Sequence, residues 1–483
     1  MGRAASRWRS QIPNERKRRY DPASLSASPA RPYLALRHRD YRRLAISQFV
    51  SIVGSQMQVV AINWHIYLLT RSPLALGFVG LTRVVPIVVF SLWGGVLADR
   101  LDRRRLMTVT QLAMTTVALA LAGVTFAHRE TLWLLYALNF FSASAVAFDG
   151  PARQALIPRL VPPEDLPGAL SLNLSVFQAG LIGGPALAGL IIAGHLGPLH
   201  VPAARFPSAG APTSTEALAL IYLLNALSFL AVIFALVTMK TSGAPEKGTE
   251  HEHPWKALRE GLRFVFTTPL MVWTMGLDFL ATFFAGAMSL LPIFADQILK
   301  VGARGYGVLV SAPAVGALIG SLLVSIRPLP SKQGRVFLAS VAAYGAATIV
   351  FGLSRSFPLT LVALAAVGFA DAISTVVRQT LRQLITPDRL RGRMTSVNMI
   401  FFMGGPQLGE LEAGLVASLF ASTVVGVTFS VVSGGAATVL VAGVIAARAK
   451  SVRRYDFRDH AAMAPAFPIQ EPTPGRAGTP IEK

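Results

Sequence analysis

The chain has no cysteine among its 483 residues, which excludes disulfides, thiolate metal sites and cysteine nucleophiles. Charge is also scarce, because Asp, Glu, Lys and Arg together make up 14% of the residues, whereas soluble globular proteins average about a quarter. Acidic residues are the rarer kind, with 24 Asp and Glu against 45 Lys and Arg. Hydrophobic residues make up 53% of the chain, and this composition predicts a membrane protein.

Motifs of enzyme chemistry are missing as well. The sequence contains no G-x-x-x-x-G-K-[ST] for binding nucleotide phosphates and no G-x-S-x-G nucleophile elbow. The glycines of "GARGYG" (302–307) follow no strand pattern, and the two histidines of "HEH" (251–253) lack further metal ligands. We therefore predict a protein that is not an enzyme and that has no metal site and no cofactor.

Long apolar runs are the dominant feature of the chain. A run of roughly 20 apolar residues crosses the hydrocarbon core of a bilayer as one helix. The sequence predicts twelve such helices, at approximately 44–67, 75–98, 105–126, 131–151, 169–194, 216–239, 268–295, 305–326, 334–354, 358–377, 395–419 and 424–447. The expected fold class is an all-α membrane protein.

The basic residues lie on one side of these runs. With the N-terminus placed in the cytoplasm, the inner segments hold 38 Lys and Arg and the outer loops hold six. This asymmetry predicts a multi-pass protein of the cytoplasmic (inner) membrane with both termini in the cytoplasm. It also explains the net charge of +21 without nucleic acid. The expected partners are the lipid bilayer and a small-molecule substrate, and we expect a monomer.

The composition of the termini and loops predicts the domain organisation. Residues 1–33 lack the apolar core of a signal peptide, and the segment "WKALREGLRFVF" (255–266) has the spacing of an interfacial helix. The predicted parts are a disordered basic cytoplasmic tail (1–33), an N-terminal six-helix half (34–239), a cytoplasmic linker (240–258), a C-terminal six-helix half (259–450) and a disordered cytoplasmic tail (451–483).

The two halves share a repeat. Shifting the chain by 225 residues against itself aligns polar residues and glycines in one ungapped register. The aligned pairs include Arg153 with Arg378, Asn173 with Asn398, Gly180 with Gly405, Gly184 with Gly409 and Gly189 with Gly414. The register predicts two parallel six-helix repeats.

The loop after the second run carries a recognisable motif. In "GGVLADRLDRRRL" (94–106), a glycine precedes an acid and a block of arginines, and the residues concerned are Gly95, Asp99, Arg100, Arg103 and Arg104. With the two repeats, this motif resembles the major facilitator superfamily of secondary transporters. The resemblance implies twelve transmembrane helices and transport by alternating access.

Further motifs resemble the exporters of this superfamily. The segment "GLIGGPALAG" is similar to their antiporter signature, with Gly180, Gly184, Pro185 and Gly189 in place and Ala188 at one expected glycine. The segments 149–166 and 378–394 resemble the branch that contains the enterobactin exporter and drug efflux proteins. Two departures stand out. The run "LWLLYALNFFSASAVAF" lacks the arginine that the superfamily carries in its fourth helix, and the second-half loop "SIRPLPSKQGRVF" lacks the acid.

Ionisable residues at membrane depth are costly and mark candidate functional sites. The proton-coupling candidates are Asp278, Glu410, Glu412 and Asp371. Asp278 could instead have a buried hydrogen-bonding role, the glutamates could be structural or gating residues, and Asp371, like Asp149, could pack a helix end.

Three other sites follow from position in the predicted helices. Arg83 and Glu410 are expected at similar depth on neighbouring helices, where an ion pair would close an outer gate. Asp99 is expected to latch onto the N-terminus of the helix at 395–419, with Gly95 allowing the approach. The substrate cavity is expected to use polar and aromatic residues of its lining helices, namely Gln56, Asn63, Asn139, Phe279 and Phe283.

The expected function is proton-coupled efflux of amphipathic small molecules, of drug or siderophore type, with the proton gradient as the energy source. An importer or a lipid-type transporter of the same fold is an alternative. A second alternative is a non-transporting membrane receptor or assembly subunit, which would tolerate the loss of the membrane carboxylates.

Overall fold

The computed structural model describes residues 32–194, 215–244, 254–327, 330–387 and 390–456. Every regular element in these ranges is a helix. The long helices are α1 (Arg39–Thr70), α2 (Pro73–Arg100), α3 (Arg103–Phe126), α4 (Leu132–Leu156), α5 (Leu166–Ile192), α6 (Thr215–Val237), α8 (Pro269–Phe284), α10 (Gly302–Ile326), α11 (Gln333–Leu353), α12 (Phe357–Ile385), α13 (Arg391–Ser418) and α14 (Thr423–Arg448). The shorter ones are η3 (Pro32–Arg37), η4 (Ile157–Arg159), α7 (Pro254–Thr267), η5 (Ala287–Leu290), α9 (Leu291–Ile293), η6 (Phe294–Ile298) and α15 (Lys450–Arg454).

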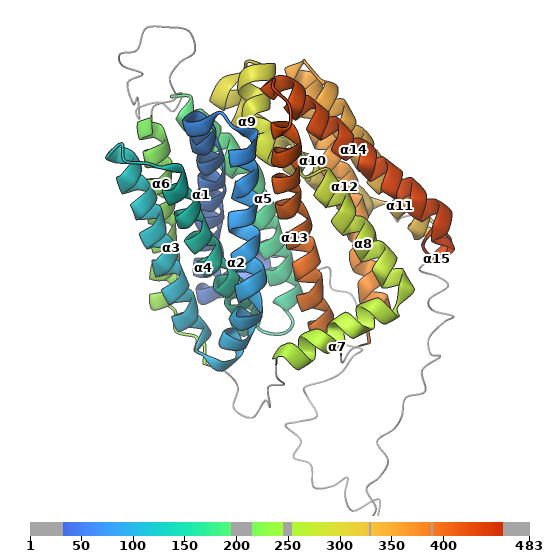
Figure 1. Cartoon of the computed structure of the whole chain (residues 1–483). Helices are drawn as coiled ribbons and strands as arrows, with labels where there is room; N and C mark the ends of the chain where they lie inside the picture. Colours follow the sequence, from blue (N-terminus) through green and yellow to red (C-terminus); the bar gives the residue numbers. More distant parts are fainter. Residues whose placement is uncertain (1–31, 195–214, 245–253, 328–329, 388–389, 457–483) are drawn as a thin grey trace, which may run out of the picture. The chain divides into compact units, whose positions relative to one another are not determined.

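Each of the twelve long helices overlaps one of the twelve predicted spans, and the all-α membrane fold is confirmed. Within the described residues, eleven helical segments are long and apolar enough to cross a membrane. Helix α13 has the required length, but Glu410, Glu412 and Gln407 lower its apolar content. The predicted interfacial helix at 255–266 is α7, which runs at a steep angle to α8 in Figure 1.

The span predicted at 268–295 is not one continuous helix. Helix α8 ends at Phe284, and a 3₁₀ turn, one turn of α-helix and the π-helical η6 continue the chain to Ile298. Pro292 supplies no backbone N–H, so the helical hydrogen bond to Met288 is missing. Gly286 lies at the break, where an added Cβ would come within 2.8 Å of the Gly409 backbone. The predicted span is therefore present, but its helix is interrupted at Ala285 and Gly286, where it contacts α13 closely.

The described residues divide into two compact units. Residues 32–62, 89–194 and 215–244 form the first, and residues 63–88, 254–327, 330–387 and 390–456 form the second. The end of α1 and the first part of α2 thus belong with the second unit. In the predicted linker 240–258, residues 245–253 lie outside the described residues, and residues 254–258 belong to α7.

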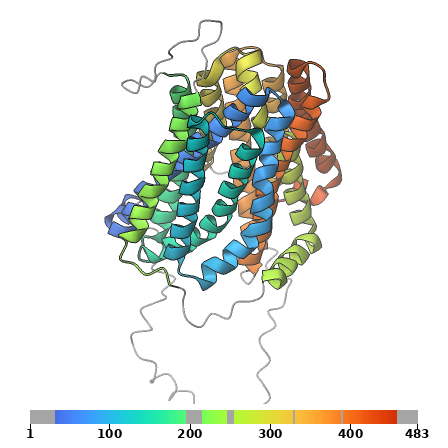
Figure 2. The ribbon, with the colours of Figure 1, turned by 60° about the vertical axis from the view of Figure 1, so that its left-hand side comes forward.

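In the first unit, α3 packs against both α4 and α6, as Figures 1 and 2 show. A buried cluster of the first unit joins the ends of these helices that are expected to face the cytoplasm. Its members include Leu44, Met107, Leu156 and Leu236, each with at most 2% of its surface exposed. The Tyr41 hydroxyl donates to the carbonyl oxygen of Ala169 at 2.7 Å and ties α1 to α5.

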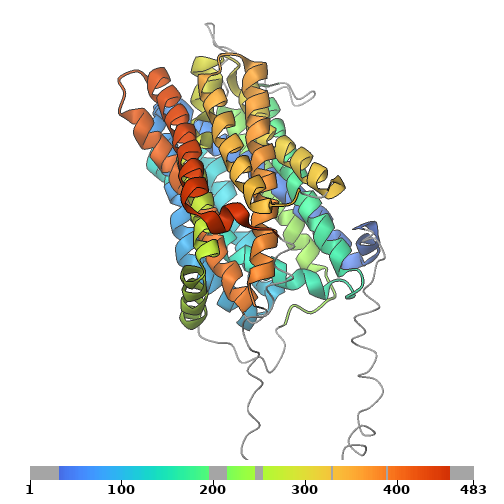
Figure 3. The ribbon, with the colours of Figure 1, turned by 90° about the vertical axis from the view of Figure 1, so that its right-hand side faces the viewer.

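In the second unit, α12 packs between α10 and α11, and α14 packs on α11, α13 and α8. Figure 3 shows these helices in yellow to red. A buried cluster with Leu277, Phe337, Val377 and Ile445 joins α8, α11, α12 and α14.

The predicted C-terminal tail needs a correction at its start. Residues 451–454 were expected to be disordered, but they belong to α15, which packs against α11 and α14. The backbone N–H of Gly334 donates to the Tyr455 carbonyl at 3.1 Å, and that of Lys332 donates to the Asp456 carboxylate at 2.9 Å. These contacts give the segment tertiary partners. The remaining predicted tail residues, 457–483, and most of the predicted N-terminal tail lie outside the described residues.

Candidate functional site

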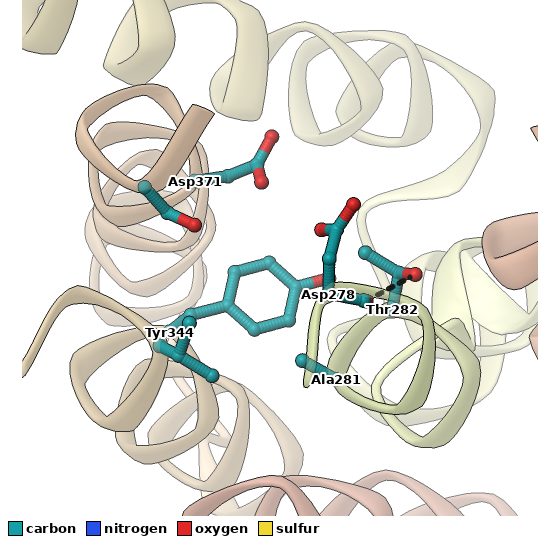
Figure 4. Close-up of a pocket in the computed structure, with 7 residues that line it drawn as sticks. Asp278, Ala281, Thr282, Tyr344 and Asp371 are labelled. Carbon is teal, nitrogen blue, oxygen red and sulfur yellow. Dashed lines mark hydrogen bonds between the residues drawn. The ribbon is translucent and has the colours of Figure 1, made fainter. Parts of the chain in front are cut away.

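A small pocket in the second unit contains two carboxylates. Asp278 and Thr282 line it from α8, Tyr344 from α11, and Asp371 and Ser374 from α12. Figure 4 shows the Asp278 and Asp371 carboxyl groups on facing sides of the pocket, with the Tyr344 ring reaching from α11 toward α8. The Thr282 hydroxyl donates to the backbone carbonyl of Asp278 at 2.8 Å. The structure therefore brings together two of the four proton-coupling candidates.

Arg378 joins these two carboxylates. It forms an ion pair with Asp278, and its Nη2 lies 3.5 Å from Oδ1 of Asp371. The same nitrogen donates to the Thr375 hydroxyl at 2.6 Å. The Arg378 side chain is 6% exposed and that of Asp278 is 13% exposed, while that of Asp371 is 43% exposed. Arg378 thus faces two carboxylates at membrane depth, and Arg382, four residues further along α12, also acts on Arg378 electrostatically.

Arg378 was not among the predicted site residues, because the predicted span ended at 377. Helix α12 continues to Ile385, so Asp371, Ser374 and Arg378 follow one another at helical spacings of three and four on one face. The signal that could have found Arg378 was the repeat, in which it aligns with Arg153.

The first unit holds the counterpart of this arginine. Helix α4 extends past its predicted end at 151 to Leu156, so it does contain a charged pair, Asp149 and Arg153. The run 132–148 has no charge, so the mid-helix arginine of the superfamily is absent as predicted, and Arg153 lies in the last turn of α4. Asp149 is fully buried, pairs with Arg153, and accepts hydrogen bonds from Thr110 and Gln111, both at 3.0 Å. The Asp149 pair therefore joins α3 to α4.

The glutamates of α13 lie away from this pocket's lining. Helices α2 and α13 approach closely, because a Cβ on Gly80 would lie 2.1 Å from the Gln407 carbonyl oxygen. Arg83 and Glu410 interact electrostatically across this contact. Nevertheless, Nη2 of Arg83, Oε2 of Glu410 and Oε2 of Glu412 are buried without a hydrogen-bond partner in the described structure. The predicted gate residues are thus near one another but do not form a hydrogen-bonded pair.

A different ion pair forms at the predicted outer end of the second unit. Arg71, after α1, lies 2.7 Å from the Asp296 carboxylate in η6. The Tyr67 hydroxyl donates to the same Asp296 oxygen at 2.5 Å, and Arg71 donates to the Tyr67 hydroxyl at 2.8 Å. The sequence pattern does not indicate this cluster, because Asp296 is more than 200 positions from Tyr67 and Arg71, and the two charges resemble ordinary loop charges.

The glycines of the antiporter-like motif pack α5 against α1. A Cβ on Gly180 would lie 2.3 Å from the Ile52 side chain, and one on Gly184 would lie 2.5 Å from Cβ of Gln56. Pro185 and Gly189 are buried in the same helix. The repeat partners Gly405 and Gly409 of α13 approach α8 in the same manner, because a Cβ on either would lie 2.3 Å from an atom of Thr282 or Phe283. Both units thus use the motif for close helix contact.

The loop motif at 94–106 is only partly described. Gly95 and Asp99 lie in the last turns of α2, but their side-chain surroundings are outside the described residues, and the latch remains a prediction. Asp102 caps α3 by accepting from the Arg104 backbone N–H at 2.9 Å. The Arg103 backbone N–H donates to the Gly243 carbonyl at 3.0 Å, Arg104 donates from its side chain to the Thr241 carbonyl at 3.1 Å, and Arg100 is exposed.

The predicted cavity residues are divided between the units. Gln56 and Asn139 belong to the first, and Asn63, Phe279 and Phe283 belong to the second. Phe279 stacks on Phe283 with ring centroids 6.1 Å apart. It also meets Phe401 of α13 edge to face at 6.0 Å. Asn63 is buried beside the Tyr306 hydroxyl. Within one unit, only the aromatic pair is brought together.

Comparison with known proteins supports the fold and the transporter assignment. Residues 30–476 match the model of a family described as transmembrane secretion effector. The enterobactin exporter EntS of Shigella boydii is 26% identical over 380 residues, which covers 78% of this chain and 85% of that protein. EntS of Escherichia coli gives the same values.

Solved structures with the same fold include transporters of several kinds. A bacterial homologue of the human lysosomal transporter Spinster, inward-facing and occupied, has a TM-score of 0.64 at 14% identity and covers 89% of this chain and all of its own. A POT family transporter in complex with a thioalcohol-conjugated peptide has a TM-score of 0.67 at 11% identity, covering 86% of this chain and 96% of its own. At these identities the likeness shows the fold alone.

Proposed function

Because the chain belongs to the transmembrane secretion effector family and has the fold of the major facilitator superfamily, we propose that this membrane transporter exports amphipathic small molecules and that the proton gradient drives the export. The observation that carries the proposal is the Asp278–Arg378–Asp371 cluster. Charged groups at membrane depth are rarely kept without a use. The carboxylates argue against a non-transporting receptor, which would not need them.

The charges of the cluster suit proton coupling. With both aspartates ionised, the set of Asp278, Asp371 and Arg378 has a net charge of −1, so one bound proton makes these three groups neutral. A proton on Asp278 would weaken its ion pair with Arg378 and leave Asp371 as the arginine's counter-ion. Asp278 and Arg378 belong to α8 and α12, so the change alters the attraction between these two helices. We propose that this change biases the transporter between its two access states.

Relatives and aromatic residues support an amphipathic substrate. The similar curated proteins are named enterobactin exporters, which favours a siderophore or drug type of molecule and outward transport. Phe279, Phe283 and Phe401 form a cluster of aromatic rings on α8 and α13. Such rings bind apolar parts of a ligand.

Transport into inverted membrane vesicles tests the proposal. The substrates are a hydrophobic cation, a macrolide and a catecholate siderophore, each measured with and without an imposed proton gradient. We expect gradient-dependent uptake of at least one of them, and a protonophore should abolish it. Uptake that continues unchanged with the protonophore present would refute proton coupling, and uptake into right-side-out vesicles instead would indicate an importer.

We also propose that Arg83 and Glu410 pair in another state of the cycle and thereby close an outer gate. Their unpartnered nitrogen and oxygen atoms support this, because buried charged groups are costly when unpaired. Each of Arg83→Glu and Glu410→Arg should reduce export, and the double charge exchange should restore part of it. A double variant with no more export than the worse single variant would contradict the pairing.

A further inference from the structure

The first unit contains a second small pocket, which is lined in part by Arg153, the repeat partner of Arg378. It lies between α1, α4 and α5. Gln48, Arg153 and Asn173 contribute polar groups, and the remaining lining is mainly apolar. The second-unit pocket is lined by Asp278 and Asp371, the acidic partners of Arg378, and by Thr282 of α8. The first-unit pocket is lined by Arg153 itself and by Gln48 of α1.

Two hydrogen-bond donors at this pocket have no partner. Nε2 of Gln48 and Nε of Arg153 are buried and make no hydrogen bond to any described residue. Gln48 is only 3% exposed, so its amide is well inside the helix packing. An unsatisfied buried donor is destabilising because it loses its hydrogen bond to water, and native structures contain few such groups. Two such groups lining one cavity indicate that an acceptor occupies it for part of the transport cycle.

The acceptor is not supplied by the neighbouring carboxylate. Asp149 already pairs with Nη2 of Arg153 and accepts from Thr110 and Gln111. The Tyr41 hydroxyl is committed to the Ala169 carbonyl. With Asp149 neutralising Arg153, the pocket has no net charge but retains two free donors. The pocket of the second unit is the opposite case, because there two carboxylates share one arginine.

We propose that the pocket at Gln48 and Arg153 is a subsite for an anionic oxygen, a carboxylate or phenolate, of the molecule that the protein carries. The subsite rests on the proposed function, and it assigns a different role to each unit. The second unit has excess carboxylate and takes the proton. The first unit has excess donors and takes the acceptor end of the substrate, while the apolar lining contributed by Leu44, Ile157 and Val176 contacts the adjoining hydrocarbon.

Binding of a matched ligand series to the purified full chain in detergent tests the subsite. The ligands are 4-butylbenzoate, its methyl ester and 4-butylbenzylammonium, which share an apolar body and differ in the charged end. The variants are Gln48→Leu, which removes the donor with little change in shape, and Gln48→Glu, which places a carboxylate in the pocket. Gln58→Leu is the control, because Gln58 lies on the same helix but accepts from Asn225 at 2.8 Å outside this pocket.

We expect the wild-type protein to bind the benzoate more tightly than the ester and the ammonium compound. Gln48→Leu should weaken benzoate binding about tenfold, as for loss of one hydrogen bond to a charged group, and Gln48→Glu should weaken it further. Gln48→Leu should not change binding of the ammonium compound, Gln48→Glu should not weaken it, and Gln58→Leu should leave the preference for benzoate intact.

Equal benzoate affinity in the wild type and in Gln48→Leu would overturn the proposal, as would a wild type that binds none of the three ligands. In either case the pocket would hold a bridging water only. Because binding is measured without a gradient, these results are independent of proton coupling. A transporter that fails the vesicle assay but shows the expected affinity changes would retain the subsite and lose the coupling.

Discussion

Replacement of Asp278 by Asn tests the coupling site most directly. The amide keeps the size and polarity of the side chain but cannot bind and release a proton. Asp278 is 13% exposed and pairs with Arg378, which is 6% exposed. Removing one member of a buried ion pair typically costs about 3–5 kcal/mol. Here Arg378 keeps Asp371 and the Thr375 hydroxyl as partners, so we expect a loss at or below about 3 kcal/mol. The protein should therefore fold.

Two assays on the same vesicles separate coupling from binding. Gradient-driven export should disappear in Asp278→Asn, whereas exchange of labelled for unlabelled substrate across the membrane, which needs no net proton movement, should continue. Thr282→Val is the matched control, because Thr282 lines the same pocket without a charge and should retain most of its gradient-driven export. Full gradient-driven export in Asp278→Asn would refute the assignment and move the role to Asp371, Glu410 or Glu412.

Three further predictions concern helix contacts. Asp296→Asn removes the exposed ion pair with Arg71, which is worth up to about 1 kcal/mol, so labelling of a cysteine introduced near the outer mouth should rise about two- to fivefold. Unchanged labelling would mean that the pair does not hold the outer end closed. Gly184→Val places a Cβ 2.5 Å from Gln56 of α1 and should lower the melting temperature, whereas Gly183→Val, with open space around its Cβ, should not. Equal melting temperatures for the two variants would argue against close packing of α5 on α1. Asp99→Asn should reduce export and increase labelling of a cysteine introduced near the inner mouth, since a latch of about 2 kcal/mol shifts a two-state equilibrium some 30-fold. If neither effect is seen, the motif would serve only to orient the chain in the membrane.

Sequence alone determined the twelve helices and the repeat, because both depend on local properties. An apolar run of sufficient length must form a helix in lipid, since its backbone groups have no other partners there. Matched glycines mark the 225-residue repeat in the sequence, and Gly180 and Gly405 make equivalent contacts in the two units. The same local reasoning selected Asp278 as an ionisable residue at membrane depth.

Only the tertiary structure decided which charges meet. Helical periodicity shows which residues share a face of one helix, but not which helix packs against that face. Arg378 lies a hundred positions from Asp278, and the packing of α8 against α12 brings it into an ion pair with Asp278 and within 3.5 Å of Asp371. Likewise, the helix break at Gly286 and the Tyr67–Arg71–Asp296 cluster depend on contacts between segments distant in the chain. A charge at membrane depth can be recognised from sequence, whereas its partner is set by the three-dimensional packing of the helices around it.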